Sequence, residues 1–158
     1  MINNLKFLRE WKWVILAGCG IIVLFFTLRL WNLTILPVFA DEAIYIRWSQ
    51  VMRAESTLRF LPLSDGKQPL FMWTTIPFLK LFSDPLIAGR MVSVLAGLGT
   101  LAGLFLLSFT LFRSKKIALL TTLFYAVVPF TVFFDRMALA DSLLAMFGVW
   151  VLYLGVLL

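Results

Sequence analysis

The sequence predicts an all-α protein that crosses a membrane several times. Of its 158 residues, 62% are hydrophobic and 14% are charged, and the mean hydropathy is +0.99. Soluble chains are about half apolar and about a quarter charged, so this chain has too few polar residues to cover a water-exposed surface. Long uncharged stretches recur, with Lys, Arg and Trp near their ends, as at membrane boundaries. We expect about four transmembrane helices, an amphipathic helix on the outer face and a short apolar juxtamembrane segment.

Four stretches are long enough to be transmembrane helices, which need about 20 apolar residues. The first covers residues 13–28 and continues to Trp31 with only Arg29 interrupting. The others cover residues 91–112, 117–134 and 142–158. The last stretch runs to the end of the chain with no anchoring charge after it. We therefore expect residues 1–158 to be the amino-terminal part of one larger membrane-embedded domain, inactive by itself.

The first apolar stretch is predicted to be an uncleaved signal anchor. Lys6, Arg9 and Lys12 precede it, and the candidate small-residue cleavage site at residues 38–40 lies too far beyond it. Basic residues collect on the cytoplasmic side of membrane proteins. We expect a multi-pass protein of the inner (plasma) membrane with its amino terminus in the cytoplasm.

The segment 69–82 allows two interpretations. It is apolar but short, contains Pro77 and carries Lys80 near its end. It either spans the membrane in a tilted orientation or lies along the outer face. The second interpretation leaves the basic cluster at residues 113–116 on the cytoplasmic side, which agrees with the positive-inside tendency, and we favour it.

The remaining features of the chain are short. From Asp41 onward, Ile44, Trp48, Val51 and Met52 recur at helical spacing, which predicts the apolar face of an amphipathic surface helix. Residues 64–66 read as a turn. A small-residue motif at residues 99–103 is typical of close helix contact, and a merely flexible apolar helix explains it equally well.

Missing residue types restrict the chemistry. The chain has no His, which excludes a Ser-His-Asp triad and a His-ligated metal site within these residues. Its single cysteine, Cys19, has no partner for an intrachain disulfide. The net charge of +6 is explained by membrane anchoring, because no basic stripe with interleaved aromatics indicates nucleic-acid binding. Catalysis must therefore depend on Asp, Glu, Lys, Arg or Tyr.

Two acidic sites adjoin the predicted spans. Asp41 and Glu42 begin the amphipathic helix, and Asp135 and Asp141 flank Arg136 just before the fourth span. Carboxylates at the ends of hydrophobic helices are costly to bury and are candidates for function. The structural alternative is that Asp41 and Asp141 cap their helices while Asp135 and Arg136 form an exposed ion pair. From the residues alone, both interpretations stay open.

Basic side chains supply the second half of a candidate binding site. Arg47, Arg53, Lys67 and Arg136 all belong to the predicted outer side. A cationic group there can bind a phosphate at the membrane surface, whereas contact with lipid headgroups explains most such residues. The sequence leaves both roles open.

The order of these features resembles a known family. The relevant stretches are residues 29–33, 37–45, 67–73, 88–93 and 136–141. The ordered set resembles the amino-terminal part of the glycosyltransferase C superfamily. It is most similar to the bacterial branch related to dolichyl-phosphate-mannose protein mannosyltransferases and lipid A aminoarabinose transferases. The resemblance extends from about Arg29 to Leu158.

The resemblance implies roles for particular residues. Asp41 matches the catalytic acid that follows the first span, and Glu42 matches the acid beside it. Lys67 matches a lysine that engages the lipid-linked phosphate, although Gln68 stands where the family has the first of two prolines. The second acidic motif on the outer face is matched by Asp141, with Arg136 before it.

The implied reaction is transfer of a sugar from a polyprenyl-phosphate donor to the hydroxyl of a lipid, glycan or protein acceptor, with inversion. Asp41 would be the general base, and Lys67 with Arg47 would neutralise the departing phosphate. Arg136 and Asp141 would border the same cavity. We expect no metal and no cofactor, although paired carboxylates can hold Mg²⁺ or Mn²⁺. A transporter or channel subunit and a non-catalytic membrane scaffold are the alternatives.

Overall fold

The computed structural model describes the backbone of residues 2–158 and the side chains from Trp11 onward. The predicted cytoplasmic positions of Lys6 and Arg9 therefore lie outside the described side chains. The described residues form seven α-helices, two short 3-10 helices and no strand, so the all-α prediction is confirmed. The elements are α1 (Ile2–Leu30), α2 (Ala40–Ala54), η1 (Ser56–Leu58), η2 (Leu61–Asp65), α3 (Leu70–Leu81), α4 (Pro85–Phe112), α5 (Lys115–Val127), α6 (Pro129–Asp135) and α7 (Asp141–Leu157).

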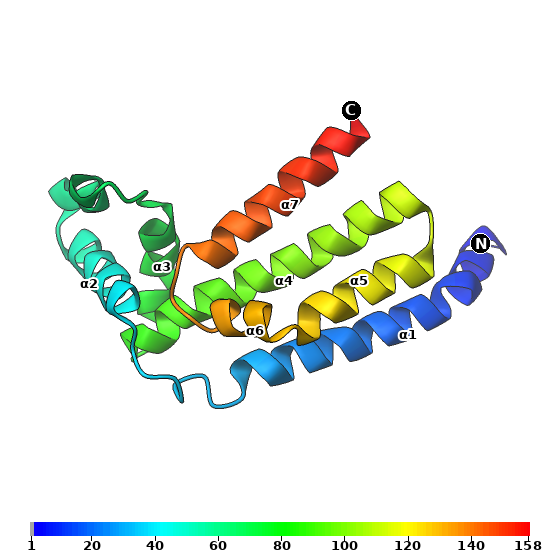
Figure 1. The fold of residues 1–158 in the computed structure, drawn as a ribbon, viewed down its shortest axis with the longest axis horizontal. Helices are drawn as coiled ribbons and strands as arrows, with labels where there is room; N and C mark the ends of the chain where they lie inside the picture. The colour runs from blue at the N-terminus through cyan, green and yellow to red at the C-terminus, as the bar shows by residue number, and fades with distance from the viewer. Residues whose placement is uncertain (1) are drawn as a thin grey trace.

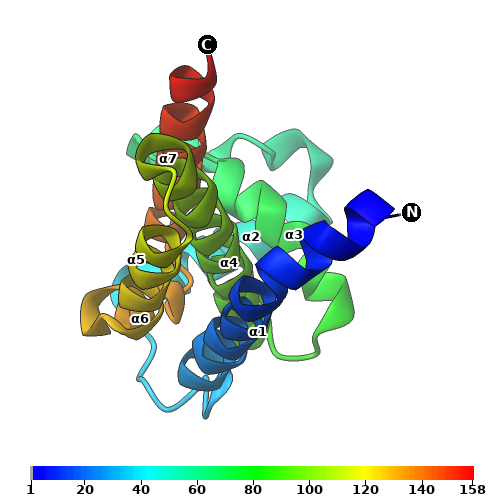
Figure 2. The same ribbon diagram turned by 90° about the vertical axis from the view of Figure 1, so that its right-hand side faces the viewer.

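The long helices form a bundle with one elaborated end. α1, α4 and α5 lie side by side, and α7 packs along α4 while diverging from α5 (Figure 1). α2, α3 and the two 3-10 helices gather where α1 ends and α4 begins, which we call the α2–α3 end. The α4–α5 turn and both chain termini lie at the opposite end and face the viewer in Figure 2. Both acidic sites consequently lie at one end of the bundle.

The helices of the structure support a membrane protein but do not confirm a count of four spans. Two helical segments, Trp11–Leu30 and Pro85–Phe112, are long and apolar enough to cross a membrane. α5 and α6 qualify as a third only when taken together, with a bend of 63° between them. The break has a local cause, because Pro129 begins α6 and cannot donate the hydrogen bond that would continue α5. α7 has 17 residues, so the fourth span stays a prediction.

α3 is too short to cross the membrane as a helix. Its 12 residues rise about 18 Å, against an apolar core about 30 Å thick. It packs against both α2 and the beginning of α4. This geometry supports the interpretation in which the segment 69–82 does not span.

The buried face of α2 differs from the predicted one. Its buried side chains are Glu42, Ile46, Ser49 and Met52, whereas Ile44, predicted to be on the apolar face, is exposed. Ile46 and Met52 join a core with residues of α3, α4 and α7. The predicted face was assigned to the membrane surface, so the exposure of Ile44 does not contradict it, and that assignment stays a prediction. In the structure α2 rests largely on α3, and a carboxylate belongs to its buried face.

Glycines allow α4 and α7 to approach closely. A Cβ atom at Gly103 would lie 2.8 Å from Cγ1 of Val149, and one at Gly99 would collide with Met146. The indole of Trp150 donates a hydrogen bond of 3.0 Å to the carbonyl oxygen of Gly99. Of the two interpretations of the motif at residues 99–103, close helix contact is therefore confirmed.

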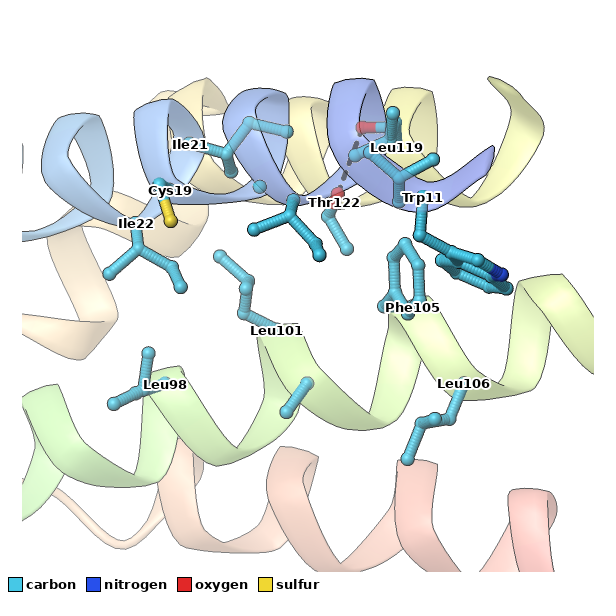
Figure 3. Close-up of a pocket in the computed structure, with 14 residues that line it drawn as sticks. Trp11, Cys19, Ile21, Ile22, Leu98, Leu101, Phe105, Leu106, Leu119 and Thr122 are labelled. Atoms are coloured by element: carbon cyan, nitrogen blue, oxygen red, sulfur yellow. Dashed lines mark hydrogen bonds between the residues drawn. The ribbon is translucent and has the colours of Figure 1, made fainter. Parts of the chain in front are cut away.

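α1 leaves an apolar groove beside α4 and α5. The groove encloses about 490 Å³, and Figure 3 shows Trp11, Ile21, Leu98, Leu101 and Phe105 among its walls. Cys19 also lines it and is a free, exposed thiol. The groove lies within the membrane-spanning part of the bundle, away from both acidic sites.

Candidate functional site

The first candidate is an ion pair between α2 and the loop before α3. Nζ of Lys67 donates a hydrogen bond of 2.8 Å to Oδ1 of Asp41. The Asp41 side chain is 46% exposed and the Lys67 side chain 29% exposed, so both are accessible from outside the bundle. Two groups that the sequence predicted to cooperate, 26 residues apart, are thus in direct contact.

Aromatic rings of α2 flank this pair. Nζ of Lys67 lies 5.0 Å from the centroid of the Tyr45 ring and 6.0 Å from that of Trp48. The two rings are stacked on each other with a centroid distance of 6.1 Å. Asp41, Tyr45 and Trp48 are four and three residues apart, so they share one face of α2. The face combines an acid, a cation and flat apolar surfaces, which is a suitable composition for a sugar phosphate.

The Asp41 carboxylate also affects the protonation of Lys67. The hydrogen bond to Asp41 raises the pKa of Lys67 above its ordinary value, although partial burial opposes this. Lys67 therefore stays protonated throughout the physiological range.

The alternative that Asp41 is a helix cap is wrong. α2 begins at Ala40, Phe39 occupies the N-cap position, and no side chain caps the helix from there. The backbone N–H of Phe39 instead donates to Oε2 of Glu42 at 3.3 Å. The carboxylate of Asp41 is thus left available to Lys67 and to solvent.

Glu42 occupies a very different environment from its neighbour. Its side chain is fully buried and accepts two hydrogen bonds from Arg90, at 2.7 Å from Nε and 2.8 Å from Nη2. Arg90 is also fully buried, and its guanidinium donates further bonds to the carbonyl oxygens of Leu33 and Leu36. This arrangement satisfies a buried charge pair on both sides, as burial requires.

The same carboxylate ties together three segments of the chain. Oε1 of Glu42 accepts a 2.8 Å hydrogen bond from the backbone N–H of Ala138, which lies in the link between α6 and α7. Arg90 is in α4, and the carbonyls that it binds follow α1. Glu42 therefore connects the first acidic site to the second.

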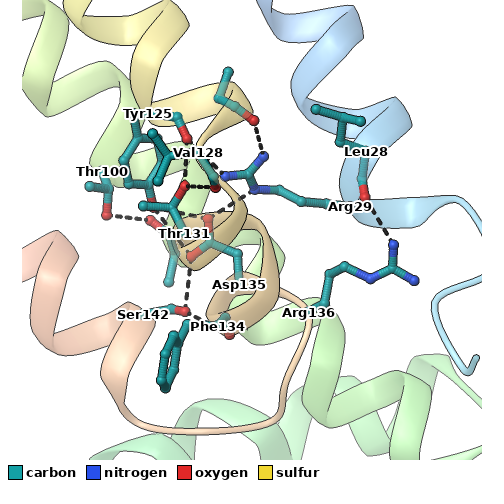
Figure 4. A network of polar contacts seen from close by, with 12 residues as sticks. Leu28, Arg29, Thr100, Tyr125, Val128, Thr131, Phe134, Asp135, Arg136 and Ser142 are labelled. Atoms are coloured by element: carbon teal, nitrogen blue, oxygen red, sulfur yellow. Dashed lines mark hydrogen bonds and ion pairs between the residues drawn. The ribbon is translucent and has the colours of Figure 1, made fainter. Parts of the chain in front are cut away.

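Asp135 belongs to a buried polar network. Its Oδ2 accepts a 2.9 Å bond from Nε of Arg29, and its carboxylate also accepts bonds from the hydroxyls of Tyr125 and Ser142 (Figure 4). The alternative of an exposed ion pair between Asp135 and Arg136 is wrong. The partner is Arg29, 106 residues away, because the end of α1 packs against α5 and α6.

Arg29 also completes the broken helix. Pro129 leaves the carbonyls at the end of α5 without their usual donors. Arg29 donates to the carbonyl oxygen of Ala126 at 2.9 Å, and Thr131 donates to that of Tyr125 at 2.7 Å. The guanidinium lies 3.8 Å above the ring of Phe25, which further holds it in place.

The structure places Arg136 at the end of α1. Its Nη atoms donate to the carbonyl oxygens of Leu28, Trp31 and Asn32 at 2.7–3.0 Å. These are groups at and just after the last turn of α1, which need outside donors. Arg136 therefore acts as a helix cap, and its Nε is buried without a hydrogen-bond partner in the described residues.

Asp141 is exposed at the start of α7. It does not cap the helix, since Ala140 occupies the N-cap position, and the capping alternative is wrong here as well. With Asp135 and Ser142 it lines a small pocket of about 120 Å³. The structure sets Asp141 at the same end as Asp41 without a contact between them.

Arg47 is separated from the Asp41–Lys67 pair. It is exposed and lines a different pocket with Gln50 and Arg53. Six helical residues place it about a third of a turn around α2 from Asp41. The structure thus brings Lys67, but not Arg47, to the first acid.

The sequence reasoning assigned no role to Arg29 or Arg90. Both lie in stretches that carry the family resemblance, residues 29–33 and 88–93, and each interrupts or begins a stretch that would otherwise be uncharged. A charge at membrane depth nearly always has a partner. This rule predicts a carboxylate partner for each arginine, but only the packing of α1 and α4 shows which carboxylate that is.

No group of three or more Asp, Glu, Cys or His side chains suited to a metal ion occurs in the part of the chain that the structure describes. Each buried carboxylate described above is instead satisfied by an arginine and by hydrogen-bond donors.

A family model described as dolichyl-phosphate-mannose-protein mannosyltransferase matches residues 66–158, which is more than half of the chain. The chain belongs to this family. Within this mannosyltransferase family match lie Lys67, Arg90, Asp135 and Asp141, whereas Asp41 precedes it. No curated protein and no solved structure matches the chain. Membership implies a glycosyltransferase that acts at a membrane.

Proposed function

We propose that this protein transfers a sugar from a polyprenyl-phosphate donor to an acceptor hydroxyl on the outer face of the membrane, with inversion. Family membership supports glycosyl transfer. The observation that carries the proposal is the contact between Asp41 and Lys67 at the α2–α3 end. It places a base and a phosphate-binding cation together, half exposed, where the apolar spans end.

The chemistry assigns one group to each side of the reacting carbon. The acceptor oxygen attacks the anomeric carbon while the bond from that carbon to the phosphate oxygen breaks. Asp41 takes the proton of the acceptor hydroxyl, and the polyprenyl phosphate leaves with the bonding electrons. Lys67 stabilises the negative charge that collects on the departing phosphate.

The ion pair must open for this reaction. With no substrate bound, Lys67 neutralises Asp41. A donor phosphodiester carries one negative charge, as the carboxylate does, and can take the place of Asp41 beside Lys67, which releases the carboxylate to act as a base. The negative charge on the phosphate grows as its bond to the sugar breaks, so Lys67 binds the departing group more strongly than the donor. Tyr45 and Trp48 flank the ammonium on its other side and offer the sugar flat surfaces on which to pack.

Glu42 has a positioning role in this proposal. A carboxylate that is fully buried and bound by Arg90 has no path to an acceptor hydroxyl. It holds the first turn of α2 against α4 and the link before α7, which fixes the direction in which Asp41 points. Arg136 similarly positions the end of α1, and Asp141 borders the cavity as an exposed acid.

The buried charges argue against a transporter. Arg29 pairs with Asp135 and Arg90 with Glu42, and all four side chains are nearly or completely inaccessible. A substrate path needs charged groups that line a water-filled route. In the described side chains, the buried charges cross-link helices instead.

Replacement of Asp41 by Asn tests the proposal. The full-length protein is reconstituted in liposomes with a polyprenyl-phosphate sugar, and transfer to the acceptor is measured. We expect Asp41→Asn to reduce kcat by about 10²- to 10⁴-fold, the usual contribution of a positioned base. Lys67→Gln should chiefly weaken donor use.

Asp65→Asn is the matched control, because Asp65 is an exposed acid two residues before Lys67 and forms no ion pair in the described residues. It should leave transfer unchanged. Normal transfer by Asp41→Asn would remove Asp41 from its role and favour a scaffold.

A further inference from the structure

A second polar pocket opens on another face of α2. It encloses about 440 Å³ between the carboxyl-terminal half of α2 and the connection from α3 to α4. Its polar lining consists of Arg47, Gln50 and Arg53 of α2 and Ser83 of the connection. Residues at positions 47, 50 and 53 are spaced by three, so they share one side of the helix. Their side differs from the one that carries Asp41, Tyr45 and Trp48.

The pocket has an unbalanced positive charge. Neither Arg47 nor Arg53 has an ion-pair partner in the described residues, and no carboxylate lines the pocket. The nearest acid of the connection, Asp84, points its Oδ1 at the backbone N–H of Leu86 at the start of α4. By contrast, Arg29 and Arg90 each have a carboxylate partner. Arg47 and Arg53 thus lack the carboxylate partner that the buried Arg29 and Arg90 have.

One of the two arginines is held in place. Nη1 of Arg53 donates a 2.6 Å hydrogen bond to the carbonyl oxygen of Leu79 in the last turn of α3. This leaves the remaining N–H groups of its guanidinium for a ligand. Arg47 makes no hydrogen bond or ion pair in the described part of the chain and is free to close on an anion. Gln50 and the hydroxyl of Ser83 add neutral donors between and beside them.

The opposite wall of the pocket is apolar and lies where a span begins. Leu79, Phe82 and Pro85 form it, and Pro85 is the first residue of the membrane-spanning helix α4. This depth is where phospholipid phosphates lie relative to spanning helices. An anion that is attached to apolar chains matches both walls, whereas a fully water-soluble anion matches only the arginines.

We propose that this pocket binds the phosphate of an anionic membrane phospholipid and thereby fixes α2 and α3 at the membrane surface. Arg47 and Arg53 bind the phosphate, Gln50 and Ser83 bind the polar part of the headgroup, and the first acyl carbons rest on Phe82 and Pro85. The site is separate from the Asp41–Lys67 pair and does not depend on the proposed transferase activity.

A lipid-binding measurement tests the site. The full-length protein in a neutral detergent is titrated with dihexanoyl phosphatidylglycerol, and dihexanoyl phosphatidylcholine serves as the neutral reference. Bound lipid is counted by native mass spectrometry, and the melting temperature is followed in parallel. We expect the wild-type protein to prefer the anionic lipid by about tenfold or more, which corresponds to about 1.4 kcal/mol.

The double variant Arg47→Gln/Arg53→Gln should lose this preference. The control Arg59→Gln/Lys80→Gln removes the same charge from two exposed residues of the same region outside the pocket, and it should keep the preference. Equal losses in the two double variants would mean that only diffuse surface charge attracts the lipid, which overturns the proposal.

Two further measurements distinguish a loss of lipid binding from misfolding and from the binding of a different ligand. Arg47→Gln alone removes no hydrogen bond or ion pair within the described residues, so it must itself lower the affinity several-fold, and an unchanged affinity contradicts the proposal. Inorganic phosphate is added without lipid in the third arm. Stabilisation by inorganic phosphate as strong as by phosphatidylglycerol, and lost in Arg47→Gln, would replace the lipid with a free phosphate anion.

Discussion

At the scale of single residues, Asp41 and Glu42 show how one helical step separates two neighbouring carboxylates. Each residue turns about 100° around the helix axis, so the two side chains leave α2 in different directions. Asp41 reaches Lys67 at the exposed edge, and Glu42 enters the interior to meet Arg90. Only the exposed acid can reach a substrate, whereas the buried acid contributes to the architecture of the site.

Glu42→Ala should destabilise the protein strongly. The substitution leaves the Arg90 guanidinium buried without its carboxylate, and removal of one member of a buried pair typically costs about 3–5 kcal/mol. The measurement is the free energy of unfolding in mixed detergent micelles. Glu55→Ala is the control, because Glu55 is exposed and its carboxylate has no partner in the described residues, and it should change stability by at most about 0.5 kcal/mol. Equal stability of the two variants would contradict the role of Glu42.

The titration of Lys67 reports on its contact with Asp41. The carboxylate raises the pKa of Lys67, so the stabilisation from the pair is complete below the ordinary lysine pKa and is lost as pH rises through the raised value. Asp41→Asn should lower the pKa of Lys67. NMR of ¹³C-methylated lysine follows this directly, with Lys80 as an exposed internal reference. A Lys67 titration that does not move in the variant would show that the pair does not form.

At the scale of elements, the broken helix α5–α6 depends on residues from three other helices. Pro129 interrupts the backbone ladder, Arg29 from α1 supplies donors to the freed carbonyls, and Asp135 holds Arg29 in place. Ser142 of α7 joins the same carboxylate, while Gly97 of α4 leaves the space that it occupies. The bend is therefore a product of tertiary contacts as much as of proline.

Gly97→Ala should disturb this network. A Cβ atom at position 97 would overlap the Asp135 carboxylate, which the surrounding bonds prevent from moving away. We expect a loss of about 1–3 kcal/mol in unfolding free energy, as for other overpacked interiors. Gly148→Ala is the matched control, since a Cβ atom there meets nothing within 4 Å, and it should be neutral or slightly stabilising. Equivalent unfolding curves for both variants would mean that Asp135 is not held where the structure places it.

At the scale of the whole molecule, the two acidic sites share one end of the bundle. The end of α1, the start of α4, α6 and the start of α7 all meet there beside α2 and α3 (Figure 1). Within that end, Glu42 links α2 to the segment before α7, because its Oε1 accepts a hydrogen bond from the backbone N–H of Ala138, three residues before Asp141. The proposed function requires that this end face the outside of the cell.

Cysteine labelling tests this orientation. In a Cys19→Ala background, Ser64→Cys, Lys116→Cys and Asp141→Cys place single thiols at exposed positions of both ends. A membrane-impermeant thiol reagent on intact cells should label positions 64 and 141 and leave position 116 unlabelled. Labelling of position 116 together with protection of positions 64 and 141 would place the acidic end in the cytoplasm and contradict a site on the outer face.

The sequence by itself determined the class of protein, the family and the apolar helices, because hydrophobicity and helical length are local properties. It also predicted the cooperation of Asp41 and Lys67, through the order of motifs. It did not reveal the break at Pro129, the buried face of α2, or the separation of Arg47 from the first acid. Only the tertiary structure decided which carboxylate meets which arginine, since Arg29 with Asp135 and Arg90 with Glu42 are paired across 106 and 48 residues. Such pairs depend on how helices pack, and no local pattern encodes the partner.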